Sequence, residues 1–155
     1  MISASFKEAL AAAVQRNADL IEVYKRTART LLSRSAANLA KSAADQREEL
    51  GRNLADFSSS LPADLAAVKL SIDERFLRTG NGDSTVAGGE EKKLLIDALT
   101  HAQAAEDEDR QLFSCLARAA AAGHPDTAAE LDAFSDQARK RAAWAQDHLD
   151  LLALS

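Results

Sequence analysis

Glu106 is the residue of this sequence whose type and position could support chemistry. Steps of seven through Leu99, Glu106 and Phe113 place it on the apolar edge of a long helix, where a carboxylate needs a partner. Such a carboxylate either helps to bind a metal ion or forms an ion pair with a buried cation. The residues that can meet Glu106 therefore decide which chemistry is available.

The elements that would position Glu106 and its partners are four long amphipathic helices. The 155 residues fit one domain, and a sequence rich in alanine with only six glycines and two prolines favours an all-α fold. Apolar residues recur in steps of three and four along most of the chain. The expected helices cover residues of about 5–32, 36–58, 90–122 and 126–153.

A long crossover, residues 59–89, separates the second helix from the third. Pro62 suits the first turn of a short extra helix, which we expect over residues 63–77. Its inward side chains would be Leu65, Val68, Ile72 and Phe76. The other two connections are short turns. This order of connections predicts an up-down-down-up four-helix bundle in which the middle pair of helices runs parallel.

Four polar residues interrupt the apolar stripes near the midpoints of the four helices. They are Asn17, Gln46, Glu106 and Arg141, one on each helix. In a bundle of aligned helices these side chains should meet in one buried layer. A carboxylate facing a guanidinium, with two amides for the remaining donors and acceptors, would make a coherent polar network.

The third helix also carries an aromatic residue, Phe113, seven positions after Glu106. In this pattern the chain resembles the ferritin-like superfamily, including rubrerythrin-like domains and uncharacterised bacterial relatives. The resemblance covers nearly the whole chain and is best in residues 94–152. It implies a bundle with one crossover. In that family, glutamates on the first and third helices and Glu-x-x-His on the second and fourth hold two metal ions.

Most of the family's ligand positions differ in this chain. The first helix has Asn17 in place of the carboxylate, the second has Ala43 and Gln46, and the fourth has Ala138 and Arg141. Arg141 would put a fixed positive charge where a metal should sit. We therefore expect no metal, no cofactor and no catalytic residue, and a polar network in place of the metal centre.

Two alternatives for the centre stay open. A shift of one helical turn would turn other potential ligands inward and give an atypical di-metal oxidoreductase or metal-storage protein. Those potential ligands are Asp19, Glu22, Glu48, Glu49, Asp109 and His148. Separately, Asp109 and His148 could form a second polar layer or a single-metal site, although a histidine near a bundle end is more often simply hydrogen-bonded.

Composition restricts the partners and the compartment. A formal net charge of −5 argues against a nucleic-acid surface, and no apolar stretch is long enough to cross a membrane. The lone Cys115 suits a reducing compartment, and residues 1–7 show no export signal, so we expect a cytoplasmic protein.

The expected mode of action is association rather than catalysis. We expect a homo-oligomer, most simply a dimer, or binding to an unidentified protein partner. Trp144 lies beside the apolar stripe of its helix and suits a subunit contact. The alternative is a lipid or granule surface, because Lys25, Arg26 and Arg29 line an outer face of the first helix.

Overall fold

Four long helices form most of the chain in the computed structural model, which describes residues 1–77 and 90–154. Within those ranges the long helices are α1 (Phe6–Thr30), α2 (Arg34–Ser59), α4 (Glu91–Ala120) and α5 (Pro125–Ala153). Each bound lies within about two residues of the bound expected from the sequence. The fold is therefore predominantly α-helical, as the composition predicted.

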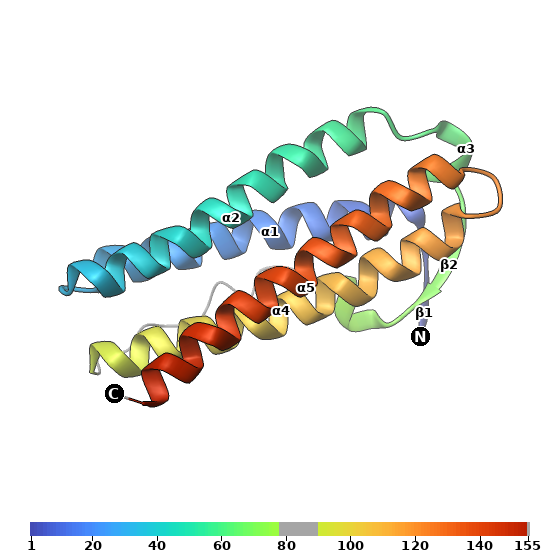
Figure 1. The fold of residues 1–155 in the computed structure, drawn as a ribbon. Coiled ribbons are helices and arrows are strands. Elements are labelled where there is room, and N and C mark those ends of the chain that lie inside the picture. Colours follow the sequence, from blue (N-terminus) through green and yellow to red (C-terminus); the bar gives the residue numbers. More distant parts are fainter. Residues whose placement is uncertain (78–89, 155) are drawn as a thin grey trace.

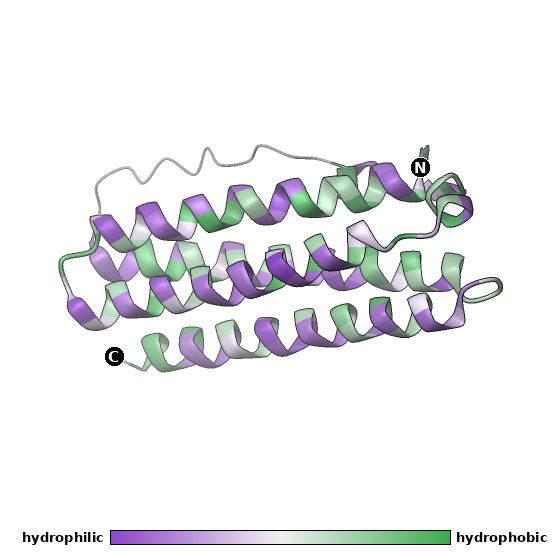
Figure 2. Cartoon of the chain, turned by 90° about the horizontal axis from the view of Figure 1, so that it is seen from above, coloured by the Kyte–Doolittle hydropathy of each residue, from purple (hydrophilic) through white to green (hydrophobic). Residues whose placement is uncertain are grey.

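The long helices pack as two antiparallel hairpins, α1 with α2 and α4 with α5 (Figure 1). In that view α2 and α4 run in the same direction, so the middle pair is parallel as expected. The hydropathy view from above shows polar and apolar residues alternating along every long helix, which is the pattern of helices that each bury one face (Figure 2).

Side chains mark where these helices begin. The Ser5 hydroxyl accepts from the backbone N–H of Glu8 at 3.0 Å, and the Ser33 hydroxyl accepts from Ala36 at 3.4 Å. At the start of α4, the Glu91 carboxylate accepts from the backbone N–H groups of Leu32 and Ser33. That contact holds the beginning of the second hairpin against the turn of the first.

The extra helix expected over residues 63–77 is present only in its first turn, and the prediction is wrong for the rest of that range. The segment contains a one-turn helix α3 (Ala63–Ala66), a strand β2 (Lys69–Ile72) and a 3-10 turn η1 (Glu74–Leu77). Strand β2 pairs antiparallel with β1 (Ile2–Ser5). The apolar spacing fitted a helix equally well, but pairing with the amino-terminal residues satisfies the backbone and still buries Leu65, Ile72 and Phe76. The remaining crossover residues, 78–89, lie outside the described residues.

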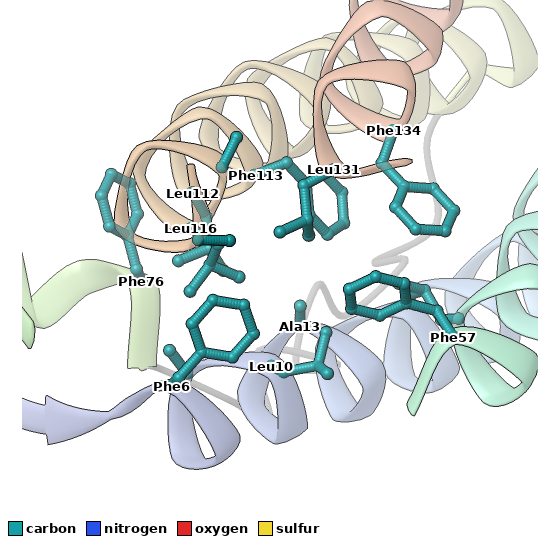
Figure 3. Packing of buried hydrophobic residues seen from close by; sticks show 14 of the residues in the cluster. Phe6, Leu10, Ala13, Phe57, Phe76, Leu112, Phe113, Leu116, Leu131 and Phe134 are labelled. Carbon is teal, nitrogen blue, oxygen red and sulfur yellow. The ribbon is translucent and has the colours of Figure 1, made fainter. Parts of the chain in front are cut away.

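The apolar core is divided along the bundle by polar residues. Figure 3 shows the larger cluster, where aromatic residues of α1, α2, η1, α4 and α5 gather at one end. Phe134 packs edge-on against Phe57, with ring centroids 5.6 Å apart, and lies 5.4 Å from Phe113. Smaller clusters around Tyr24 and around Leu99 fill the other half. Between the larger cluster and the Tyr24 cluster lies the polar layer described next.

Candidate functional site

Six polar side chains from all four long helices meet in the middle of the bundle, and we call them the central polar network. They are Arg16 and Asn17 from α1, Arg47 from α2, Glu106 and Asp109 from α4, and Arg141 from α5. Arg47 is only 1 % exposed and Asp109 only 2 %. Charges as deeply buried as these require partners with good geometry.

Asp109 is the better satisfied of the two carboxylates. Its Oδ1 accepts from Arg16 Nε at 3.1 Å and from Arg16 Nη2 at 2.7 Å, and its Oδ2 accepts from Arg47 Nη1 at 2.6 Å. Burial by itself would raise the pKa of Asp109, but the guanidinium groups of Arg47 and Arg16 hold it below its ordinary value. Asp109 is therefore an anion at neutral pH.

Glu106 has a different environment. Its Oε2 accepts from Arg141 Nε at 2.8 Å, which is the pair expected from the sequence. Its Oε1 lies 2.7 Å from Arg47 Nη2 as an ion pair without the alignment of a hydrogen bond. Burial raises the pKa of Glu106, and the attraction of Arg47 and Arg141 does not fully offset that effect.

Arg47 connects the parts of the network. Its Nη1 donates to Asn17 Oδ1 at 3.3 Å as well as to Asp109, and its backbone carbonyl accepts from Asn17 Nδ2 at 2.9 Å. Arg16 extends the network to the crossover, because its Nη1 donates to the carbonyl of Phe76 at 2.8 Å. The network thus joins both helical hairpins and the segment between them.

The structure brings together three of the four residues expected in the polar layer, namely Asn17, Glu106 and Arg141. Gln46 is the exception, because it is half-buried beside the layer and its neighbour Arg47 takes the place expected for it. From Ala43 to Leu50, steps of four then three lead through Arg47, and steps of three then four lead through Gln46. The apolar spacing alone does not separate the two residues, and arginine is rarely buried.

Arg16 was not predicted either. It directly precedes Asn17 on α1, so the same uncertainty of one residue in the inward position applies. A signal was present in the charge count: Arg141 alone could serve one carboxylate, so an inward Asp109 required a second cation. Arg16 and Arg47 are the cations that fall beside Asn17 and Gln46 in the sequence.

Asp109 and His148 do not share a second layer. The helices α4 and α5 are antiparallel, so moving from Glu106 to Asp109 and from Arg141 to His148 leads in opposite directions along the bundle. With a rise of about 1.5 Å per residue, the two side chains are displaced by roughly 15 Å along the axis. Instead, His148 packs against Trp144, with ring centroids 4.6 Å apart.

Tyr24 lies beside the central polar network, in the next layer of the bundle. It is buried, and its hydroxyl has no hydrogen-bond partner among residues 1–77 and 90–154. Burial raises the pKa of Tyr24, an effect that Arg47 opposes, so the hydroxyl stays protonated and can act as a donor.

The donor set at the centre does not fit a dinuclear metal site. Glu106 and Asp109 are its two carboxylates, both lie on α4, and both are engaged by arginine side chains. Arg47 reaches between them, so a divalent cation there would meet a guanidinium. In the described ranges no group of three or more His, Cys, Asp or Glu residues could hold a metal ion.

A cleft of about 720 Å³ opens near the end of the bundle that holds the turn between α1 and α2. Its walls come from the beginnings of α2 and α4 and from the end of α5. Apolar side chains in the walls are Leu39, Leu95, Trp144 and Leu152, and polar ones include Ser33, Asn38 and His148. Trp144, which was expected beside the apolar stripe of its helix, is half-buried and lines this cleft.

Exposed leucines lie at the same end of the bundle as this cleft. Leu32 is 94 % exposed, Leu151 is 62 % exposed and Leu154 is 85 % exposed. Leu32 precedes Ser33 on one wall, and Leu151 precedes Leu152 on the other. We call these three leucines and this cleft the leucine end.

Among the described helices, none is long and apolar enough to cross a membrane. No protein-family model matches this chain, and no curated protein or solved structure shows significant similarity to it.

Proposed function

We propose that this protein is a metal-independent, non-catalytic member of the ferritin-like bundles that acts by associating with a second copy of itself. The observation that carries the proposal is the leucine end, where exposed leucines lie beside a cleft whose walls include apolar side chains. Groups of exposed large apolar residues on a small protein usually mark a contact surface.

The central polar network supports the non-catalytic part of the proposal. Three guanidinium groups surround two carboxylates, so neither carboxylate has free oxygens directed at an open space for a substrate or a metal. A network of this kind fixes the registry of the two hairpins. The network thereby holds the bundle in one arrangement.

The form of the leucine end supports a second copy as the partner. A twofold contact requires a surface that is complementary to itself. Here exposed leucines and a cleft with apolar walls lie at the same end of the bundle, so each copy offers both an apolar surface and a recess. The surroundings also carry both signs of charge, with exposed Arg29 and Arg34 on the α1–α2 side and exposed Asp147 and Asp150 on α5.

Sedimentation velocity over a range of protein concentrations tests the proposal. The wild-type protein should sediment as a dimer at micromolar concentration, and the double variant Leu151→Ser, Leu154→Ser should sediment as a monomer with an unchanged helical circular-dichroism spectrum. Val14→Ser is the matched control, because Val14 is exposed on α1 away from the leucine end. A monomeric wild type would contradict the proposal. So would a double variant that associates as strongly as Val14→Ser does.

A further inference from the structure

Three buried donors in and beside the central polar network have no acceptor among the described residues. They are Arg47 Nε, Arg141 Nη2 and the Tyr24 hydroxyl; a fourth donor, Arg47 Nη2, also lacks an aligned hydrogen bond but lies 2.7 Å from Glu106 Oε1. Arg47 and Arg141 both contact Glu106, and Tyr24 packs with Ala43 and Ala105 in the adjoining layer, so the three donors belong to one region of the bundle. Buried donors in native proteins nearly always have a partner, which is often a bound water or ion.

The buried side chains that cluster around Tyr24 are apolar. Tyr24 lies in a cluster with Ala43, Ala44, Ala102 and Ala105, whose side chains end in methyl groups. The carboxylate oxygens of Glu106 and Asp109 are already within ion-pair distance of other guanidinium nitrogens. Residues 1–77 and 90–154 supply no acceptor for these donors, so a bound water or ion is the natural partner.

The charges of the network indicate what kind of acceptor it is. Arg16, Arg47 and Arg141 carry three positive charges, and Glu106 and Asp109 carry two negative ones. An unbalanced positive charge in a low-dielectric interior is costly. A water molecule would satisfy donors but leave this charge in place, whereas a monovalent anion would do both.

We propose that the centre of this bundle binds one small monovalent anion of halide size, held by the Tyr24 hydroxyl together with Arg47 and Arg141. The site is separate from the leucine end and does not depend on self-association. Chloride satisfies its requirements, because it is spherical, accepts several hydrogen bonds at once and carries a single charge. Carboxylates the size of gluconate would not fit among closely packed helices.

Thermal unfolding in sodium chloride and in sodium gluconate at equal ionic strength tests the site. An anion that binds only the folded protein raises the melting temperature with its concentration. We expect wild type to melt at least about 3 °C higher in chloride at ten times its dissociation constant. Crystals grown in bromide should show an anomalous peak within hydrogen-bond distance of Tyr24 Oη and Arg141 Nη2.

Variants distinguish this site from a general salt effect. Tyr24→Phe removes one donor and should raise the chloride concentration at half effect by about tenfold. Glu106→Gln raises the excess positive charge and should lower that concentration. Arg141→Gln makes the network neutral and should abolish the difference between the salts, whereas Arg139→Gln, at an exposed position on the same helix, should leave it unchanged.

The proposal fails if wild-type protein melts at the same temperature in both salts. It also fails if the bromide crystals show only water beside Tyr24, or if Tyr24→Phe and Glu106→Gln respond to chloride as wild type does. The last comparison remains informative even if Arg141→Gln does not fold.

Discussion

Arg47 donates to Asp109 at 2.6 Å, and this pair joins α2 of one hairpin to α4 of the other. Both side chains are almost completely buried. A pair in this position contributes less through net attraction than through the penalty for separating its members, because either one left alone would be an uncompensated charge in the interior. Which partner is removed therefore determines how much stability is lost.

Asp109→Ala should be among the most damaging single changes in the protein. It leaves Arg16 and Arg47 facing each other without their shared anion, and we expect a loss of about 3–5 kcal/mol in the free energy of unfolding. Urea denaturation followed by circular dichroism measures this loss. Asp107→Ala, an exposed position on the same helix, is the control and should change stability little. Similar losses for both variants would contradict the importance of the network.

Glu106 should respond differently to two substitutions. Glu106→Gln keeps an acceptor for Arg141 and removes a carboxylate whose burial raises its pKa, so it should lose clearly less stability than Glu106→Ala. Glu106→Ala also removes the contacts to Arg141 and Arg47 and should lose about 3 kcal/mol or more. Urea denaturation of the two variants side by side checks the difference. Equal stabilities for the two would show that Glu106 is not the partner of these arginines.

The loss of stability in acid should come from Asp109. The pKa of Asp109 in the folded protein lies below its ordinary value of 3.8. Its contribution to the free energy of unfolding is therefore complete above pH 3.8 and disappears as the pH falls through the pKa of the folded protein. Glu106, whose pKa is raised, has the opposite effect. Its contribution to the free energy of unfolding is present below pH 4.5 and is lost as the pH rises through the pKa of the folded protein.

Melting temperatures measured between pH 7 and pH 2.5 separate the two carboxyl groups. Glu106→Gln should keep the wild-type fall in melting temperature below about pH 4, and Asp109→Asn should start from a lower melting temperature and show a smaller fall. A larger acid effect in Asp109→Asn than in wild type would reverse the assignment.

Gly51 has a packing role next to the network. Replacing an interior helix glycine by alanine ordinarily stabilises a protein by about 1 kcal/mol. At Gly51 the added Cβ would lie 3.1 Å from Asn17 Nδ2, which is held by its hydrogen bond to the Arg47 carbonyl. We expect Gly51→Ala to give no gain in stability.

A double-mutant cycle checks this explanation. In an Asn17→Ala background the obstacle is gone, so Gly51→Ala should then recover the ordinary gain. A full gain from Gly51→Ala in the wild-type background would show that Asn17 can move aside freely.

The sequence was sufficient to locate the long helices, because their apolar repeats are long and Ser5, Pro62 and Pro125 mark boundaries by local chemistry. It was not sufficient for the crossover. A repeat such as Leu65, Val68, Ile72 and Phe76 is too short to separate a helix from a strand and turn. The pairing of β2 with β1 also depends on residues far away in the sequence, at Ile2–Ser5.

The polar layer was predictable in position but only partly in membership. Asn17, Glu106 and Arg141 followed from their places at the midpoints of helices. Arg47 did not, because one residue of rotation decides between it and Gln46, and the stabilising partner of a buried arginine lies on another helix. The side chains that are hardest to place from sequence are therefore those whose burial depends on charges elsewhere in the fold.

The claim that arginine side chains close the centre of this bundle is tested most directly by the metal content of the protein. The protein should be purified from cells supplied with iron, manganese and zinc, and analysed by inductively coupled plasma mass spectrometry. We expect far less than one metal ion per chain, both for wild type and for Glu106→Ala. One or two ions per chain in wild type, lost in Glu106→Ala, would contradict it.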